Sequence, residues 1–507
     1  MYAGHQAFGK MQWPWEVFFI LPIELCERFS FFGTRTLLNQ YLKAGFGMSD
    51  EQAKSYVHLF NGLVCMFPVV GAVISDSYLG KFNSVAIFSL LSVLGNSLFA
   101  ILSIDGLVGE FGEYPLWAFL VPAVLLTLGS GSAKPCVGSH GGDQFDDKDG
   151  IDRFFSLLVV TTYIGILMAV MIVPLIKDNL GYTLAYAIPT FTMLIALVVF
   201  VSAKRLFKTI PPQRDFFPWK IIKLVAYASV RKLKGHCADN WLELASDKYS
   251  DELIQEARQV LKVIVMFSPL VFVWMLHEQN TTEWQNQYEM MEKTLFGINV
   301  PTEACSVYGV VLSIVLTPAT GILLFPFLER HGIKISAGMR VALGYLLILS
   351  SFVMSTSLQY WVRFNSTNQV RRNNITVSCA GCINGAWQIP QWLLFSLGEA
   401  IIMPAACFLA HSNVGPNMKA SAISIAFVSM AMGNYAVIAL EPILSLTSDR
   451  ILRQWCYVLI SSLFLLVYML LLKFWFIPTP SPPNRLAAKL GNIDHPPNKP
   501  NPRSSQS

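Results

Sequence analysis

The stretch Glu24-Leu25-Cys26-Glu27-Arg28-Phe29-Ser30-Phe31-Phe32-Gly33-Thr34-Arg35 decides the fold of this chain. It lies inside an apolar segment, residues 15–42, that is long enough to cross a bilayer as a helix. Its charged groups fall at membrane depth, where each would cost about 2.5–3.5 kcal/mol if it faced lipid. Because a helix turns by about 100° per residue, they share one stripe. The members of this stripe are Glu24, Glu27, Arg28 and Arg35. We expect the stripe to line a polar pathway.

The composition predicts a polytopic membrane protein. The chain has 507 residues, 53% hydrophobic and only 14% charged, with a mean hydropathy of +0.48. The net charge of +5 is small, and the basic residues cluster between apolar runs, so we interpret them as topology signals and expect no nucleic-acid partner. The nine cysteines form no zinc framework, and we find no nucleophile or nucleotide-binding loop. We therefore expect neither an enzyme nor a bound cofactor.

Twelve apolar runs are each long enough to cross the membrane. The predicted spans are residues 15–42, 54–78, 83–104, 116–138, 153–177, 183–203, 259–279, 303–327, 334–361, 389–411, 418–440 and 450–477. Lys81, Lys148, Arg330 and Lys419 all fall in loops on one side of this layout. Basic loops mark the cytosolic side, so both termini are predicted to be cytosolic.

This layout divides the chain into five parts. They are a cytosolic N-terminus (1–14), a six-helix bundle (15–203), a basic cytosolic linker with amphipathic segments (204–257), a second six-helix bundle (258–477) and a disordered cytosolic tail (478–507). We favour a linker that lies on the inner membrane surface over a regulatory domain. Two sets of six spans predict a transporter with its site between pseudo-symmetric halves. The short outer loop 362–386 carries two sequons, and we expect glycosylation at Asn365 and Asn374.

Two ionisable residues stand out in spans two and four. His58 lies on the outer side of span two and titrates near neutrality, so it suits a proton arriving from outside, although a lone histidine is often only a solvated residue. Lys134 follows a run of small residues near the inner end of span four. It needs a carboxylate partner, and Glu24 and Glu27 are the available ones. Protonation of that glutamate would free the lysine to bind an anionic substrate group.

Spans seven and ten offer carboxylates. Span seven ends in His277-Glu278-Gln279-Asn280, which is either a solvated helix end or half of an outer gate in which Glu278 pairs with Arg35. Glu399 lies about ten residues into span ten, a depth at which a carboxylate usually has a function. One half thus provides the cations Arg35 and Lys134, and the other half provides Glu399. Such a bipolar cavity suits a zwitterion of modest length.

Several motifs resemble known families. The loop Gly71–Phe82, with Asp76 and Lys81 around a glycine turn, resembles the inter-helix loop of the major facilitator superfamily. The first-span E-x-x-E-R-F pattern resembles that of the proton-coupled oligopeptide transporters, as do Lys134-Pro135-Cys136-Val137 and Trp387-Gln388-Ile389-Pro390-Gln391. This resemblance covers nearly all of the membrane part. It implies an all-α membrane protein of the major facilitator type, with twelve transmembrane helices in two six-helix bundles.

The resemblance also implies roles for individual residues. A peptide carboxylate would be held by Arg35 and Lys134, its amino group by Glu399, and the proton would be coupled by Glu24, Glu27, Arg28, Lys134 and His58, the last of which falls where animal members carry a proton-sensing histidine. Tyr163 and Trp274 are expected to contact the substrate. Several usual pocket groups are replaced, at Phe31, Phe32, Val159, Tyr163, Gly309 and Ala426. Each lost polar contact is worth about 0.5–1.5 kcal/mol, so the preferred substrate can differ from an ordinary dipeptide.

We therefore predict a proton-coupled symporter of di- and tripeptides or peptide-like zwitterions that works by alternating access. The alternatives are a related carrier for another substrate, such as histidine, nitrate or a drug, and a non-transporting sensor or scaffold that kept the fold. The expected partners are the peptide, protons and the lipid bilayer, and the expected functional unit is a monomer. The expected location is the plasma membrane, with an endosomal or lysosomal membrane as the alternative.

Overall fold

The computed structural model describes residues 14–145, 148–208, 217–235, 240–295, 298–373, 383–414, 419–447 and 449–475. Apart from one short hairpin, the regular elements in these ranges are helices. The α-helices are α1 (Val17–Phe46), α2 (Asp50–Ile74), α3 (Lys81–Leu102), α4 (Trp117–Gly142), α5 (Lys148–Ser202), α6 (Phe217–Leu233), α7 (Asp251–Phe267), α8 (Val271–His277), α9 (Glu283–Glu289), α10 (Val307–Pro318), α11 (Phe325–Arg330), α12 (Ala337–Asn373), α13 (Ile389–Ser412), α14 (Lys419–Leu444) and α15 (Arg450–Trp475). The hairpin pairs β1 (Thr294–Leu295) with β2 (Ile298–Asn299), and π-helical turns follow α2 (Ser75–Leu79) and α10 (Ala319–Leu324).

The described helices account for the twelve predicted crossings. Ten helical segments are long and apolar enough to cross a membrane. One of them, Leu157–Arg205, makes two crossings because the chain leaves helical geometry at Gly181, whose φ is 83°. The remaining crossing is α1, which is 30 residues long, packs along α5 and carries the charged stripe. The chain is a multi-pass membrane protein, as the sequence predicted.

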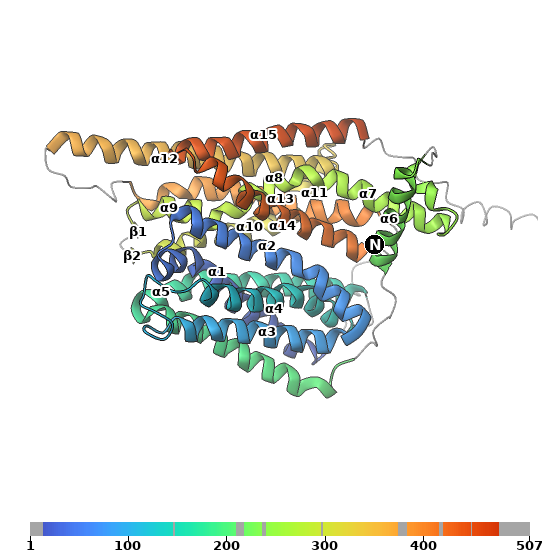
Figure 1. Ribbon diagram of the computed structural model, residues 1–507, viewed down its shortest axis with the longest axis horizontal. Coiled ribbons are helices and arrows are strands. Elements are labelled where there is room, and N and C mark those ends of the chain that lie inside the picture. The colour runs from blue at the N-terminus through green and yellow to red at the C-terminus, as the bar shows by residue number, and fades with distance from the viewer. Residues whose placement is uncertain are drawn as a thin grey trace, which may run out of the picture.

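The crossings form two bundles that lie side by side (Figure 1). We call α1 to α5 the N-half and α7 to α15 the C-half. Each half has its own hydrophobic core, around Phe99 and Phe200 in the N-half and around Trp284 and Tyr345 in the C-half. The halves meet mainly where α2 packs on α14 and α5 packs on α10. We call the end of the molecule with α6 the linker end, and the end with α9, β1 and β2 the distal end (Figure 1).

The turn between α1 and α2 fixes the distal end of the N-half. Gly47 ends α1 in the left-handed region, with a φ of 59°, and an added Cβ would lie 2.6 Å from the Gly112 carbonyl oxygen. Ser49 then caps α2, because its hydroxyl accepts the Gln52 amide N–H while the Gln52 side chain accepts the Ser49 N–H. This cap sets the direction of α2, whose next turns carry Asp50 and Lys54 toward the C-half.

The linker is more structured than a chain lying along a membrane surface. Helix α6 packs on α7 and on the 3-10 segment Trp241–Ala245, and its side chains Ile221 and Leu224 are buried in the C-half core. Ion pairs secure this contact: Arg231 lies 2.7 Å from Asp247, and Arg258 of α7 lies 3.0 Å from Glu243. The exposed face of α6 still carries Trp219, Ile222 and basic residues, as expected for an amphipathic helix.

Helix α12 extends further than the predicted ninth span. It continues from residue 361 to Asn373, so that the sequon residue Asn365 lies within the helix rather than in a loop. Asn374 and the rest of residues 374–382 of the predicted outer loop lie outside the described residues, as do residues 1–13 and the predicted tail.

Candidate functional site

The charged stripe of α1 forms a buried cluster in the N-half. The Arg28 Nε atom lies 2.7 Å from a Glu24 oxygen, and its second nitrogen lies 3.1 Å from Glu27. These three side chains are at least nine-tenths buried. Thr162 of α5 donates a hydrogen bond to Glu24 at 2.9 Å, and the Ser130 hydroxyl of α4 donates to Glu27. This part of the stripe therefore faces the bundle interior, where each of these three charges has a charged partner.

Lys134 does not form the ion pair predicted with Glu24 or Glu27. Within the described residues no carboxylate lies within ion-pair distance of its ammonium, which instead lies 5.2 Å from the centre of the Phe31 ring. The reason is local, because Arg28 lies on the same helix as both glutamates and binds both of them. Lys134 is only partly buried. In this conformation its charge is therefore not held in an ion pair with a described carboxylate.

Arg35 and Glu278 form the ion pair that the sequence predicted across the two halves. The Arg35 guanidinium lies 2.7 Å from the Glu278 carboxylate, and its Nε donates to Asn61 of α2 at 3.1 Å. We call Arg35 and Glu278 the gate pair. The Glu278 residue is 4% exposed, so the helix end that carries it is buried rather than solvated.

The gate pair continues toward Glu399 through one histidine. The His277 Nδ1 atom lies 3.2 Å from Glu278, and its Nε2 atom lies 3.5 Å from Glu399. Glu399 also accepts a hydrogen bond from Ser313 of α10 at 3.2 Å, and its side chain is 30% exposed. We call this run, from Arg35 through Glu278 and His277 to Glu399, the charged row. It links the N-half to Glu399, in the middle of α13 of the C-half.

The remaining predicted residues lie around this row. His58 is fully buried and its Nδ1 lies 2.9 Å from the Asn434 side-chain oxygen of α14, so in this conformation it does not reach water. Tyr163 is partly exposed and interacts electrostatically with Glu399. Trp274 has no exposed surface and packs edge-on against His277, so it supports the site from behind.

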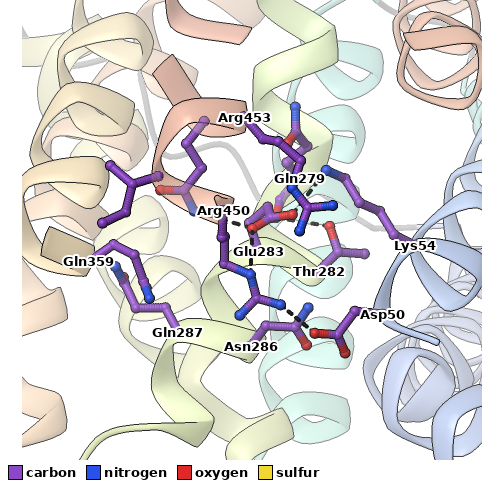
Figure 2. A network of polar contacts seen from close by, with 12 residues as sticks. Asp50, Lys54, Gln279, Thr282, Glu283, Asn286, Gln287, Gln359, Arg450 and Arg453 are labelled. Carbon is purple, nitrogen blue, oxygen red and sulfur yellow. Dashed lines mark hydrogen bonds and ion pairs between the residues drawn. The ribbon is translucent and has the colours of Figure 1, made fainter. Parts of the chain in front are cut away.

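A second set of charges joins the halves nearer the distal end (Figure 2). The Lys54 ammonium of α2 lies 2.9 Å from Glu283 and 2.8 Å from Glu441, and all three residues are more than nine-tenths buried. The Tyr457 hydroxyl donates to Glu441 at 2.6 Å, and the Lys54 ammonium lies 4.7 Å from the centre of the Tyr457 ring. Gln454 donates to Glu283 at 3.2 Å. Two buried carboxylates thus share one lysine.

Two arginines of α15 extend this set to the surface. Arg450 bonds Asp50 and lies 4.0 Å from Glu283, while Arg453 lies 2.9 Å from Glu51 and 3.5 Å from Glu441. We call the combined set the distal network; its members are Asp50, Glu51, Lys54, Glu283, Glu441, Arg450 and Arg453. Figure 2 shows Asp50 and Lys54 of α2 pointing at residues of the C-half.

The ion pairs between the halves lie toward one end of the molecule, the distal end. Lys177 pairs with Glu303 at 2.8 Å, and Lys43 pairs with Glu289 at 3.0 Å. Together with the gate pair and the distal network, these are the ion pairs that join the two halves among the described residues, and all lie between the gate pair and the distal end. The conformation is therefore closed at its distal end.

The POT family model matches residues 82–452 of this chain. The chain belongs to the POT family. This is a family of transporters and not of enzymes. Among curated relatives, Solute carrier family 15 member 1 of Mus musculus is 28% identical over 407 residues, which is 74% of this chain and 57% of that protein. Solute carrier family 15 member 2 of Danio rerio is 30% identical over 366 residues, which is 69% of this chain and 50% of that protein.

The POT chain thus spans about half the length of the curated relatives it matches. Solved POT structures share its fold. The transporter PepTSo superposes with a TM-score of 0.76 at 23% identity, covering 91% of this chain and 98% of that one. A POT family transporter in complex with 5-aminolevulinic acid gives a TM-score of 0.70 at 16% identity, covering 92% and 97%. The predicted family and the major facilitator fold are confirmed.

Several residues of this POT site were not predicted from the sequence. Lys54, Glu441, Arg450 and Arg453 lie at or near the ends of predicted spans, where a charge usually meets solvent, so they gave no signal. The regular spacing of Asp50, Lys54, His58 and Asn61 along α2 was a usable signal, because it places four polar side chains on one face of an otherwise apolar helix.

Proposed function

We propose that this POT-family chain is a proton-coupled symporter of short peptides or peptide-like zwitterions that works by alternating access. The charged row carries the proposal, because it brings Arg35 from one half and Glu399 from the other into one connected set of charges. Charges from two bundles that meet inside a membrane have a different arrangement once the bundles rock apart. Binding of a ligand or a proton to the row can therefore select one arrangement.

The substrate roles follow from the signs of the charges. Arg35 and the partly exposed Lys134 would hold a carboxylate, and Glu399 would hold an amino group, with Tyr163 beside it. Of the solved relatives, one binds 5-aminolevulinic acid, a molecule with one amino group and one carboxylate. This supports a zwitterion as the ligand class.

The coupling proton would act on the buried carboxylates of the N-half. Protonation of Glu24 or Glu27 would weaken its bond to Arg28, and His58 would exchange a proton when the distal end opens. The energetics suffice. One pH unit is worth about 1.36 kcal/mol per proton, and 100 mV of membrane potential is worth about 2.3 kcal/mol per charge.

The orientation and location are part of the same proposal. The linker end would face the cytosol, because the basic loops lie there, and the distal end would face outside. The protein would work as a monomer in the plasma membrane and need no cofactor. In an endosomal or lysosomal membrane, the transporter would use a proton gradient with the same direction, toward the cytosol.

Uptake into proteoliposomes tests the proposal. With an acidic exterior, we expect accumulation of a labelled dipeptide that stops when the gradient is collapsed with a protonophore. Arg35→Ala and Glu399→Gln should each remove accumulation, whereas Arg340→Gln, which changes a cation outside the charged row, should not. If histidine or nitrate is taken up and dipeptides are not, the proposed substrate class is wrong and the related carrier is the correct alternative. Absence of any substrate-linked proton flux would instead favour a non-transporting sensor.

A further inference from the structure

His277 is a member of the charged row, but a change in its protonation is not part of the transport mechanism proposed above. It is the last residue of α8 and is 7% exposed. Its two ring nitrogens face two different carboxylates, Glu278 at 3.2 Å and Glu399 at 3.5 Å. The second distance is that of an ion pair rather than of a hydrogen bond. One imidazole thus separates the carboxylate of the gate pair from the carboxylate of the substrate site.

Aromatic neighbours hold the imidazole in this orientation. The ring stacks on Phe395 of α13 with their centres 4.7 Å apart and an angle of 29° between the planes. Trp274, one turn earlier, meets the ring edge-on at 5.3 Å. The ring therefore cannot turn away from both carboxylates without disturbing this packing, and its protonation state is felt by both of them.

The charges favour the doubly protonated ring. Only an imidazolium has an N–H on both nitrogens, which two facing carboxylates require. With His277 protonated, the charged row alternates in sign: Arg35 positive, Glu278 negative, His277 positive and Glu399 negative. With His277 neutral, the same row holds one cation and two carboxylates, of which Glu278 is buried and Glu399 is partly exposed. A buried charge without a partner is expensive, so the proton completes the row.

Other titratable groups face this region. His58 of α2 interacts electrostatically with Glu278, and Tyr163 of α5 interacts electrostatically with Glu399. Two groups that do not titrate also bond to the row: Ser313 of α10 donates a hydrogen bond to Glu399, and Asn61 of α2 accepts one from Arg35. Among these groups His277 is the one placed between the two carboxylates.

We propose that His277 is a second proton-binding residue, separate from His58, that couples the gate pair to Glu399. The role of His277 in transport rests on the proposed function, but its effect on the gate pair can be measured without a substrate. While the distal end is closed, the imidazolium holds Glu399. When the distal end opens, Arg35 leaves Glu278, water enters and compensates the charges of Glu278 and Glu399 in place of the imidazolium, and Glu399 is released for the amino group of a substrate.

The reverse direction returns the proton. A substrate ammonium bound at Glu399 repels the imidazolium and makes loss of its proton easier. The Nε2–H bond then breaks, the electron pair stays on the nitrogen, and the proton passes to water in the exposed part of the site. His277 would thereby make substrate binding and proton release depend on each other.

The first test needs no substrate. Hydrogen exchange of the purified protein, corrected for the intrinsic pH dependence of exchange, reports how tightly the first turns of α2 are closed. We expect protection there to fall about tenfold between about pH 6 and pH 9 as His277 loses its proton. His277→Gln should show low protection at both pH values, while His331→Gln, a change of an exposed histidine that contacts the carbonyl and the ring of Phe327, should behave as the wild type.

The second test measures how strongly Glu399 binds the amino group of a substrate. Removing the imidazolium frees this carboxylate, so His277→Gln should lower the KM for a dipeptide about fivefold while reducing proton-driven accumulation. The KM for the N-acetylated dipeptide should not change. His277→Lys, which keeps a cation, should restore gate protection but make it independent of pH.

These outcomes separate the inference from the proposed function. Unchanged gate protection and unchanged pH dependence in both His277 variants would overturn the inference, even if dipeptides are transported. If the pH dependence is lost in His58→Gln alone, it belongs to His58, and this result would also overturn the inference. A pH-dependent gate that requires His277, in a protein that transports no peptide, would keep the inference and remove the proposed substrate.

Discussion

The guanidinium of Arg35, in the first helix of the N-half, lies 2.7 Å from the carboxylate of Glu278, at the end of α8 in the C-half. The two residues are 243 positions apart in the chain. Their contact is the innermost ion pair that joins the halves among the described residues, and the others lie nearer the distal end. We therefore expect it to be the last of these ion pairs to break when the distal end opens.

Removing the Arg35 charge should open the distal end. In Arg35→Gln the buried Glu278 retains only His277 as a charged partner, and breaking a buried pair in this way costs about 3–5 kcal/mol. Because the pair exists only while the halves are closed here, the cost falls on the closed conformation. Fluorescence energy transfer between labels on the distal loops of the two halves should show increased separation. Arg35→Lys keeps the charge and should give a much smaller change; an equal change would contradict the electrostatic explanation.

Lys54 should act as the centre of the distal network. Lys54→Met removes the charge but keeps most of the side-chain length, leaving Glu283 and Glu441 buried with only part of their compensation. We expect faster hydrogen exchange at the start of α2 and of α15. Mild acid should partly reverse the effect, because protonation of the freed carboxylates removes their repulsion.

Lys43→Met is the matched control for Lys54. It is the same substitution in a neighbouring ion pair, but the carboxylates of its partners Asp50 and Glu289 are 41% and 47% exposed. Exposed pairs contribute about 0–1 kcal/mol, so exchange should change little. If the two variants behave alike, burial of the Lys54 cluster does not determine its strength.

The fold was predictable from the sequence because the membrane imposes simple rules on it. Twelve apolar runs, basic loops and a long polar linker were sufficient for the crossings and the two halves. What pattern analysis could not give is the pairing of charges. Lys134 was assigned to Glu24 or Glu27 on the basis of sign alone, whereas Arg28, one helical turn from Glu24, binds both glutamates.

Helix ends were the other source of error. A charge such as Lys54 or Glu441 near the end of an apolar run usually meets water, and only the packing of α2 on α14 turns these ends into an interface. The gate pair was predictable because Arg35 lies inside an apolar run, where a partner is required, and Glu278 is a carboxylate at the outer end of span seven. The extension of α12 to Asn373 was not, because most of its added residues are polar.

The cluster around Arg28 should stabilise the N-half itself. Arg28→Gln leaves two buried glutamates without their shared cation, and we expect a loss of about 3–5 kcal/mol of stability together with loss of proton-driven uptake. In Glu27→Gln the amide oxygen can still accept the Ser130 hydroxyl, so stability should fall less. Thermal unfolding in detergent measures both. A smaller loss in Arg28→Gln than in Glu27→Gln would contradict the assignment of Arg28 as the shared partner.

Close packing of α2 on α14 should be as necessary for closure as the charges are. A Cβ added to Gly62 would lie 2.6 Å from the Tyr435 ring, so Gly62→Ala forces the two helices apart and should shift the protein toward the distal-open conformation. Tyr435→Ala in the same chain removes the clash and should restore closure. Gly321→Ala serves as the control, since a Cβ there meets nothing within 4 Å. The label separation across the distal end, measured as for Arg35, distinguishes the cases. If Tyr435→Ala does not rescue Gly62→Ala, contact between these two residues does not set how closely the halves approach.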